Sequence, residues 1–381
     1  MNTLPPETRS ILDSVPELIK KTFPVPGRFR SALPSDIAEL SRLLTNKRGS
    51  RSLSYLSRPN FLSAYLHYFL PWNLYRLCLL LPNLDFPLSS GNTITDLGCG
   101  PLTFASALWI ARPELRAIPL EINCIDRCAP ALEAGKKFFA AVCAAANGGN
   151  APWKINLIRE DVDIRRGVTR KRNHAALVCA INIFNEIYEA LPHNNVEGLR
   201  RMAANAAQLM HNEASPDASI LTVEPGVPQS GQFVSFLRTA FLELGRRPAS
   251  PCPHQAVCPM PGGKTRWCHF AFETAAAPKE LHRLSAAAGL PKERIVLSYL
   301  QTGAPSSQAA KTAEKVRVIS DAFPLPDKQF GRYGCSSQGL VLLTGEKIRI
   351  EKMASLSLAA SAFAAGGQRD KKSGALLMEV E

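Results

Sequence analysis

The sequence has 381 residues, of which 46% are hydrophobic and 20% are charged, so the chain can bury a core large enough for two domains or one elaborated domain. Its formal net charge of +13 favours a polyanionic partner, because a basic protein gains free energy by releasing counterions from phosphates. No stretch reaches the roughly 18 consecutive apolar residues of a membrane span, and the first residues lack the apolar core of a signal peptide. We therefore expect a cytoplasmic protein that does not act at a membrane, whose ten cysteines are thiols or metal ligands rather than disulfides.

The first ninety residues are expected to form an arm and a helical region. Residues 1–34 are rich in proline and are predicted to be an irregular arm. Residues 35–91 are predicted to be helical, because apolar residues recur at helical spacing behind Ser35, a plausible N-cap. The aromatic stretch "FLSAYLHYFLPWNLYRLCLLL" continues this region.

From about residue 92 the pattern changes to apolar strands that alternate with helical segments, which is typical of a wound, mainly parallel α/β sheet. The predicted domain spans residues 92–352 and carries a cysteine-rich insertion at about 247–275. The tail, residues 353–381, is rich in small residues and lysine and is predicted to be loosely ordered. The predicted strands are "TITDLGCGP", "AIPLEINCID", "INLIREDVD", "HAALVCAINIF" and "ASILTVEPG", with "RIVLSYLQTG" and "GLVLLTG" closing the sheet.

The turn "DLGCGP" lies between a predicted strand and the helical stretch "TFASALWIAR", which is the context that a nucleotide-binding turn requires. Gly98 and Gly100 would let the backbone approach a ligand closely, and the helix N-terminus would face it with free N–H groups. Asp126 ends the second strand, where an acid accepts the hydroxyls of a ribose. An NAD-dependent dehydrogenase uses a similar arrangement. Asp96 before the glycines, however, makes the turn resemble the first motif of class I S-adenosylmethionine-dependent methyltransferases more closely.

This resemblance implies a Rossmann-like fold and two further contacts to S-adenosylmethionine. Asp161 stands where such enzymes contact adenine, although it could equally just end a strand. Asn185 follows the fourth strand at the mouth where the methyl group is presented, although it could equally cap a helix. Leu102 replaces a commonly found third glycine, so its side chain would have to point away from the methionine part of the cofactor.

Three cysteines lie in the stretch "PCPHQAVCPMPGGKTRWCHF" with the spacing C-x5-C-x9-C. The stretch has no hydrophobic periodicity and therefore no core for these cysteines to fill, which favours a metal site. A fourth ligand from His254 or His269 would make a zinc site. Cys335, in a glycine-flanked turn, would make an iron–sulfur site. Ligation by sulfur alone, without C-x2-C knuckles, suits a 4Fe-4S cluster better than a zinc ribbon.

Two runs of basic residues are candidate contacts to RNA phosphates. The alternative interpretation of both is a solvated charged loop. A loop contact of this kind would strengthen binding without selecting a sequence. The candidate RNA-binding residues are Lys47, Arg48, Arg51, Arg165, Arg166, Arg170, Lys171 and Arg172.

Six segments together resemble the methyltransferase-like, Rsm-type family that assembles or accompanies the mitochondrial small ribosomal subunit, together with its bacterial homologues. They are "YFLPWNLYRL", "DLGCGP", "VEPG", "CPHQAVCPM", "WCHF" and "GRYGCSSQGLVLL". The resemblance implies that Cys252, Cys258, Cys268 and Cys335 hold a 4Fe-4S cluster, and that the protein binds small-subunit ribosomal RNA during ribosome biogenesis.

The expected function is therefore a small-subunit assembly or translation factor. It has a methyltransferase fold, carries a structural 4Fe-4S cluster and binds S-adenosylmethionine weakly or conditionally. Its expected partners are rRNA and ribosomal proteins, and it is expected to be monomeric off the ribosome. Two alternatives stay open: an active S-adenosylmethionine-dependent rRNA methyltransferase, for which no catalytic residue is identified, and an iron- or redox-sensing regulator of ribosome assembly.

Overall fold

The structure is a computed structural model. It describes residues 4–45, 55–147, 151–165, 174–188, 191–192, 195–260, 262, 266–303, 313–347, 350–359, 363 and 367–380. Seven of the eight candidate RNA-binding residues lie outside these ranges, so their predicted role is not addressed by the structure. They are Lys47, Arg48, Arg51, Arg166, Arg170, Lys171 and Arg172.

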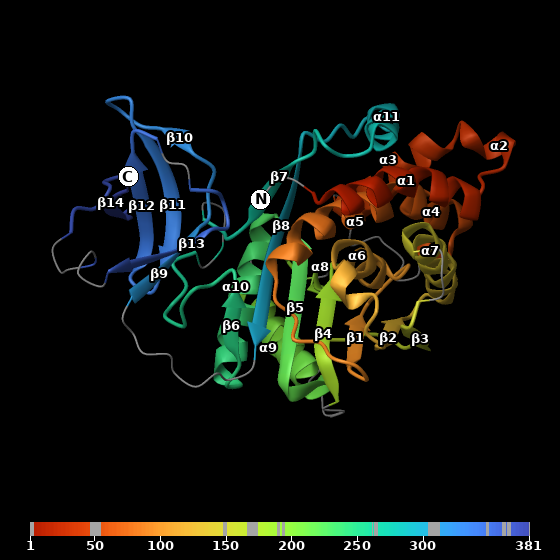
Figure 1. Cartoon of the computed structure of the whole chain (residues 1–381), viewed down its shortest axis with the longest axis horizontal. Coiled ribbons are helices and arrows are strands. Elements are labelled where there is room, and N and C mark those ends of the chain that lie inside the picture. The colour runs from red at the N-terminus through yellow and green to blue at the C-terminus, as the bar shows by residue number, and fades with distance from the viewer. Residues whose placement is uncertain are drawn as a thin grey trace. The chain divides into compact units, whose positions relative to one another are not determined.

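The described chain begins with helices, combines strands and helices from β1 to β8, and then forms strands (Figure 1). The helices are α1 Pro6–Thr22, α2 Gly27–Arg30, α3 Leu33–Thr45, α4 Pro59–Ala64, α5 Leu70–Leu80, α6 Thr103–Ala111, α7 Ala129–Asn147, α8 Phe184–Tyr188, α9 Val196–Glu213, α10 Pro228–Glu243 and α11 Lys279–Ala287. The strands are β1 Thr93–Leu97, β2 Glu121–Asp126, β3 Lys154–Arg159, β4 Ala175–Ile181, β5 Ala214–Pro225, β6 Arg247–Ser250, β7 Phe270–Glu273, β8 Arg294–Gly303, β9 Ala313–Val318, β10 Phe323–Pro324, β11 Phe330–Ser336, β12 Gly339–Gly345, β13 Ser355–Ala359 and β14 Leu376–Glu379.

The central sheet has the strand order β3-β2-β1-β4-β5-β8-β6, with β7 paired to β8 (Figure 1). Strands β1, β2, β3 and β4 pair in parallel, whereas β8 runs antiparallel to β5 and β6. This order, with one reversed strand inserted near the edge, is that of the Rossmann-like class I methyltransferase fold, so the predicted fold class is confirmed. Successive strands are added towards one edge of the sheet from β1 to β3 and towards the other edge from β4 onwards. Ligands of such sheets bind at the carboxyl ends of the strands at this switch point.

The chain divides into two compact units. The N-terminal unit comprises residues 2–219 and 271–295, and the C-terminal unit comprises residues 220–270 and 296–381 together with residue 1. In the N-terminal unit, α1, α5 and α7 all contact α6, and every residue of α6 is buried. A helix that is apolar all round needs such cover on every side.

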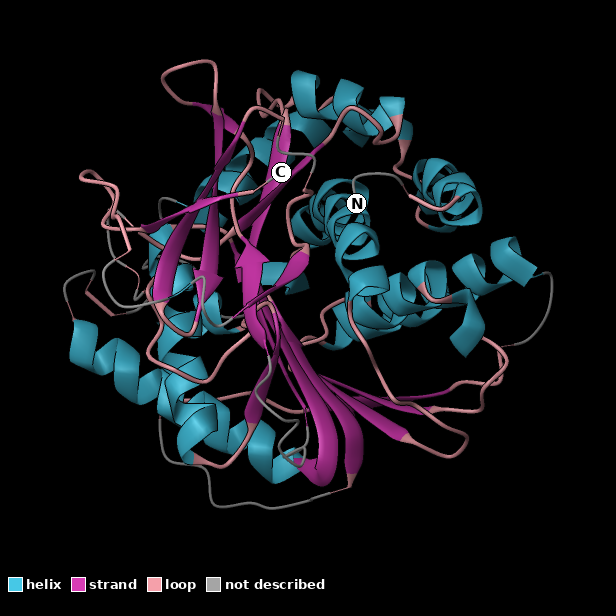
Figure 2. Cartoon of the chain, turned by 60° about the vertical axis from the view of Figure 1, so that its left-hand side comes forward, coloured by secondary structure: helices cyan, strands magenta, loops and turns pink. Residues whose placement is uncertain are grey.

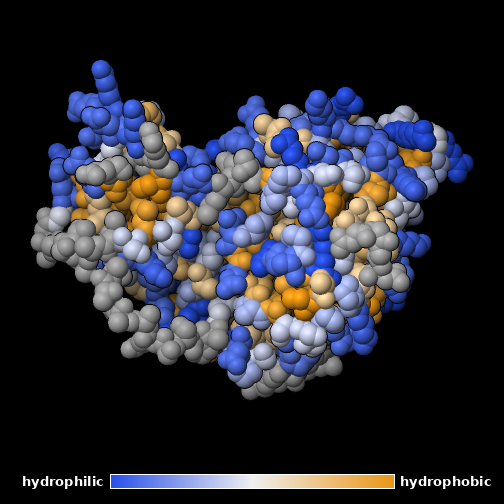
Figure 3. Space-filling view, in the orientation of Figure 1, coloured by the Kyte–Doolittle hydropathy of each residue, from blue (hydrophilic) through white to orange (hydrophobic). Residues whose placement is uncertain are grey.

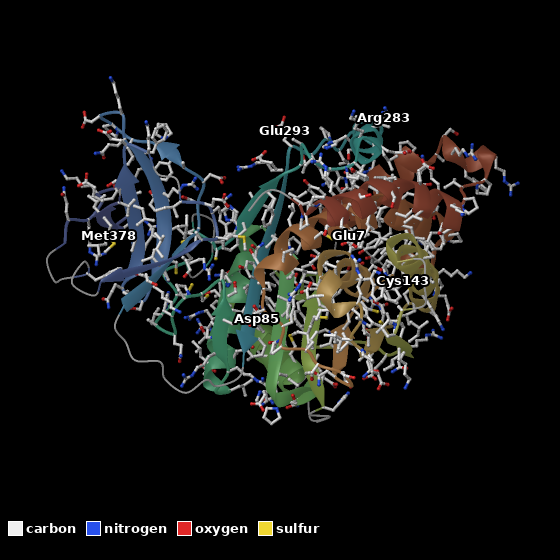
Figure 4. All side chains as sticks on the ribbon, in the orientation of Figure 1. Glu7, Asp85, Cys143, Arg283, Glu293 and Met378 are labelled. Atoms are coloured by element: carbon white, nitrogen blue, oxygen red, sulfur yellow. The ribbon has the colours of Figure 1, made fainter. Side chains whose placement is uncertain are left out.

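The expected irregular arm over residues 1–34 is instead largely helical. Proline opens α1 at Pro6, where its missing N–H costs nothing, and Ile11, Leu12, Val15 and Ile19 form a buried face. Glu7, labelled in Figure 4, forms an ion pair with the buried Arg116. This periodic apolar face outweighs the proline content, which is why composition misled the prediction.

The C-terminal unit contains a second sheet with the order β13-β9-β11-β12-β14, to which β10 is added through β11. Its core is made of Val318, Val341, Leu343, Leu376 and Met378, the last labelled in Figure 4. Figure 2 shows the sheet as strands joined by loops, and Figure 3 shows apolar atoms over it, bordered by hydrophilic ones.

This second sheet changes two expectations. The stretch "GLVLLTG" is a strand with the expected bounds, but it belongs to the second sheet and does not close the central one. The tail, expected to be loosely ordered, supplies β13 and β14. Among the described residues, no helix is long and apolar enough to cross a membrane.

Candidate cofactor and metal sites

The N-terminal unit has a cavity of about 120 Å3 at the carboxyl ends of β1, β2 and β4, where the switch point of the sheet predicts a ligand site. Five of the six predicted cofactor-binding residues line it: Asp96, Gly98, Gly100, Asp126 and Asp161. Asn185, the sixth, is 8% exposed in α8 and is not among the lining residues. Asn182 and Glu186 line the cavity from the same segment instead. Nothing in the structure tests whether these side chains contact a cofactor, so their roles stay predictions.

The two glycines of the turn both have left-handed backbone conformations, which favour glycine. Gly98 has a φ of +65°, and a Cβ there would lie 2.5 Å from Cγ1 of Ile183. Gly100 has a φ of +53°, and no neighbouring atom lies within 4 Å of the position that its Cβ would take. The turn is therefore closely packed at Gly98 and open towards the cavity at Gly100.

Leu102, at the position of the absent third glycine, also has a left-handed conformation, with a φ of 54°. Its side chain is fully buried, and its Cδ1 lies 2.6 Å from the point where a Cβ on Gly135 of α7 would stand. Leu102 is not among the residues that line the cavity. The side chain therefore packs against α7 and is not part of the cavity wall, which is the condition that the sequence set for cofactor binding.

Asp96 is fully buried at the end of β1 and contributes to the cavity wall. Its Oδ1 accepts a hydrogen bond from Sγ of Cys179 at 3.3 Å, whereas Oδ2 has no hydrogen-bond partner among the residues that the structure describes. Burial raises the pKa of Asp96 to about 8. A cationic group in the cavity would stabilise the charged carboxylate, so the site suits a positively charged ligand group.

Asp126, at the end of β2, forms hydrogen bonds to the backbone of the glycine turn and of the residues that follow β2. Its Oδ2 accepts from the backbone N–H of Gly100 at 2.9 Å, and its Oδ1 accepts from that of Cys128 at 2.8 Å. Burial raises the pKa of Asp126, and these two backbone hydrogen bonds oppose that effect. A carboxylate has about four lone-pair sites, so two remain for the hydroxyls of a ligand.

The rim of the cavity carries charged and aromatic side chains. Asp161 forms an ion pair with Arg127 at 3.5 Å, and Arg165 pairs with Asp163 at 2.8 Å. Arg165 is the one candidate RNA-binding residue in the described chain; it also lines this cavity. The hydroxyl of Tyr55 donates to Oε1 of Glu186 at 2.9 Å, which ties the residues that precede α4 to α8 at the cavity wall.

The C-terminal unit brings the four predicted metal ligands together. Cys252, Cys258, Cys268 and Cys335 all line one cavity of about 30 Å3, although Cys335 comes from β11, far along the chain. Cys335 lies within this strand and not in the expected turn. The other six cysteines are buried, as expected for packing residues; Cys143 on α7 is labelled in Figure 4.

Neither histidine lines this cavity. Nε2 of His254 lies 3.3 Å from Sγ of Cys335, and the ring of His269 stacks on Trp267 with a centroid distance of 4.8 Å. In the described part of the chain, no group of three or more His, Cys, Asp or Glu side chains is arranged to hold a metal ion. The four thiols therefore share a cavity without meeting at ligating distances.

Two arginines hold the cysteine-bearing loop. The buried Arg238 of α10 donates from Nη2 to the carbonyl oxygens of His254 at 2.8 Å and of Ala256 at 2.9 Å. Arg317 donates from Nε to the carbonyl oxygen of Pro251 at 3.0 Å. Burial raises the pKa of Cys252 to about 11, and the positive charge of Arg238 opposes this shift. Burial likewise raises the pKa of Cys268, where Arg238 again opposes the effect.

Comparison with protein families gives a match over residues 92–324 to the model described as "Mitochondrial small ribosomal subunit Rsm22". The matched region is more than half of the chain and includes the glycine turn and three of the four cysteines. The chain belongs to the Rsm22 family. Family membership relates it to the small ribosomal subunit, as the six sequence segments predicted. A comparison with curated protein sequences finds no match.

Solved structures similar to the chain include several methyltransferases. A S-adenosylmethionine-dependent methyltransferase from Thiobacillus denitrificans, bound to S-adenosyl-L-homocysteine, is 12% identical, with 60% of this chain and 91% of that chain covered and a TM-score of 0.33. Geranyl diphosphate C-methyltransferase from Streptomyces coelicolor is 10% identical, with 70% and 97% covered and a TM-score of 0.31. A methyltransferase from Aquifex aeolicus is 12% identical, with 71% and 97% covered and a TM-score of 0.30.

Proposed function

We propose that the protein is a small-subunit assembly or translation factor that binds rRNA and small-subunit proteins, and that is held in shape by a 4Fe-4S cluster on Cys252, Cys258, Cys268 and Cys335. The observation that carries this proposal is the gathering of all four cysteines around one cavity that neither candidate histidine lines. Four thiolate ligands suit an iron–sulfur cluster; His254 is the alternative ligand of a zinc site, because its Nε2 lies 3.3 Å from Sγ of Cys335.

The positive charge of Arg238 would favour the cysteine thiolates that the proposed cluster requires. Ligation requires thiolates, so the protons that burial keeps on Cys252 and Cys268 would leave when the cluster binds. Arg238 lies close enough to lower the pKa of both, and it also fixes the loop through two carbonyls. The cluster itself would supply a covalent link between the loop before β7 and strand β11.

The cavity in the N-terminal unit supports binding of S-adenosylmethionine, whose ammonium and sulfonium groups are cationic. Asp96, with an unpartnered Oδ2, would hold a cationic group, and Asp126 would accept the ribose hydroxyls. At about 120 Å3 the cavity is smaller than the 300–1,000 Å3 typical of small-molecule sites, so we propose that its lining moves to admit the whole molecule. This requirement agrees with weak or conditional binding.

A second candidate function is rRNA methylation, in which bound S-adenosylmethionine would supply an electrophilic methyl group. The observation that favours it is a set of polar side chains in the wall of the same cavity: Tyr65, Asn73, Asn182 and Glu186. Burial raises the pKa of Tyr65, and the charge of Glu186 adds to that shift, so the Tyr65 hydroxyl stays protonated and can donate a hydrogen bond to an acceptor atom.

The experiment is sedimentation of the purified protein with isolated small and large ribosomal subunits. The proposal predicts binding to small subunits that weakens steeply with salt, because phosphate contacts dominate, and little binding to large subunits. Equal binding to both subunits, or none, would contradict it. Transfer of a labelled methyl group from S-adenosylmethionine to rRNA in the same mixture would establish the second function, and its absence with cofactor bound would exclude it.

A further inference from the structure

The C-terminal unit has a second and larger cavity, of about 550 Å3, which lies within the size range of small-molecule sites. We call it the aromatic groove. It shares Met260, Cys268 and Ile319 with the wall of the cysteine cavity, but most of its lining is its own. The side chains on which the inference depends are Arg266, Trp267, His269, Phe323, Tyr333 and Lys372.

Four of these side chains form two ring pairs, of which one is stacked and the other tilted. Trp267 and His269 have ring centroids 4.8 Å apart and planes inclined by 23°, and Phe323 and Tyr333 have centroids 5.2 Å apart and planes inclined by 33°. All four are half-buried, so each keeps area that a ligand can cover. The indole N–H of Trp267 donates to the carbonyl oxygen of Gly226 at 3.0 Å, which fixes its ring. A planar ligand can therefore stack on an exposed ring face of either pair with little loss of side-chain entropy.

The charged groups that line the groove are positive on balance. Arg266 and Lys372 are exposed at its rim. Asp370 also lines it, but its Oδ2 accepts hydrogen bonds from the backbone N–H of Ser373 at 2.7 Å and from the hydroxyl of Ser373. Aromatic faces bordered by cations are the combination with which proteins hold unpaired nucleotides, because the bases stack and the phosphates meet the positive charge. A segment of apolar protein would make no use of the two cations.

We propose that the aromatic groove binds an unpaired nucleotide of RNA, with the base stacked on the ring pairs and the backbone phosphates at Arg266 and Lys372. This inference rests on the proposed binding of rRNA and names the single-stranded class of RNA and the place where it is held. Tyr333 lies in β11 and Lys372 lies shortly before β14, so the C-terminal sheet and its connections supply this part of the groove.

The test is fluorescence anisotropy of the full chain with a labelled single-stranded RNA of about ten nucleotides, a usual length for one binding site. A blunt-ended RNA duplex of the same length is the comparison and is expected to bind more weakly, because it offers no unpaired base to stack. Tyr333→Ala is expected to weaken single-strand binding about five- to 150-fold, the range for loss of one base–aromatic stack. Phe29→Ala is the matched control, because Phe29 is 51% exposed and lies on α2 in the other unit.

Lys372→Ala covers the case in which Tyr333→Ala fails to fold, because Lys372 is exposed. In this variant, the slope of log association constant against log salt concentration is expected to become shallower by about 0.7, the value for loss of one phosphate contact to a single strand. Lys371→Ala, its exposed neighbour outside the groove, is expected to leave that slope unchanged. Unchanged RNA affinity and slope in both groove variants, with the wild-type chain still binding RNA, would overturn the groove and leave the proposed function standing. A wild-type chain that binds no RNA would overturn both, and binding of an apolar peptide in place of RNA would overturn the groove as an RNA site.

Discussion

Replacing Asp96 by Asn should remove a pH dependence that the buried carboxyl imposes on stability. The pKa of Asp96 is about 8 in the folded chain, against 3.8 ordinarily, so the folded state holds a proton that the unfolded chain releases. Stability from this group is therefore complete below about pH 4 and is lost as pH rises towards 8. Each pH unit in that window is worth about 1.4 kcal/mol, which sums to about 4 kcal/mol by pH 7.

The assay is urea unfolding of the wild type and Asp96→Asn at several values between about pH 5 and pH 8. The unfolding free energy of the variant relative to the wild type should increase by about 1.4 kcal/mol per pH unit. If the new Asn NH2 group takes the place of Oδ2, which is buried without a hydrogen-bond partner in the described chain, it should cost about 1–3 kcal/mol independently of pH. A difference that stays constant across this range would refute the assignment of a raised pKa to Asp96. Addition of S-adenosylmethionine should flatten the wild-type curve, because a cationic ligand favours the charged carboxylate.

Three further changes test other parts of the sites. Leu102→Gly should lower the free energy of unfolding by about 2 kcal/mol or more, because the apolar burial that is lost exceeds the left-handed backbone strain that is relieved. It should leave the affinity for S-adenosylmethionine, measured by calorimetry, within about two-fold. Much tighter binding would mean that Leu102 obstructs the cavity. Tyr55→Phe should strengthen that affinity by about ten-fold, because it removes a hydrogen bond between two lining residues that the proposed movement would have to break. Weaker binding would contradict this view. Arg238→Ala should lower the iron content after anaerobic purification, because two loop carbonyls lose their hydrogen-bond donor and the thiols lose a nearby cation. Arg283→Ala, a change at an exposed residue of α11 (Figure 4), should leave the iron content unchanged. Equal iron in both variants would contradict the role of Arg238.

The sequence predicts the central sheet well because local and global signals agree there. The stretches from Thr93 to Leu97 and from Arg294 to Gly303 are strands at the expected positions, and α10 ends where Gly245 adopts a φ of +78°. The glycine turn is equally predictable, since Gly98 has a conformation and a close contact with Ile183 that favour glycine. The gathering of four cysteines around one cavity follows the motif resemblance, not their spacing.

Other features depend on contacts between distant segments, which periodicity does not reveal. The second sheet joins strands from residue 313 to residue 379, and β12 pairs in parallel with β14 through a long connection. Cys335 therefore lies in a strand of that sheet, and not in a turn. Glu186, and not its neighbour Asn185, lines the cofactor cavity, because α8 directs adjacent side chains to different sides. Asn182, which also lines it, precedes this helix. The aromatic groove likewise joins Trp267 to Tyr333 across many residues.

The most direct test of the account is anaerobic purification followed by iron, sulfide and zinc analysis with an absorption spectrum, for the wild type, Cys335→Ser and Cys143→Ser. The account predicts about four irons and four sulfides per wild-type chain, the composition of a 4Fe-4S cluster. It also predicts their loss in Cys335→Ser and their retention in Cys143→Ser, because Cys143 is a buried packing residue of α7. One zinc per chain, retained in Cys335→Ser and lost when His254 or His269 is replaced, would contradict the four-cysteine cluster.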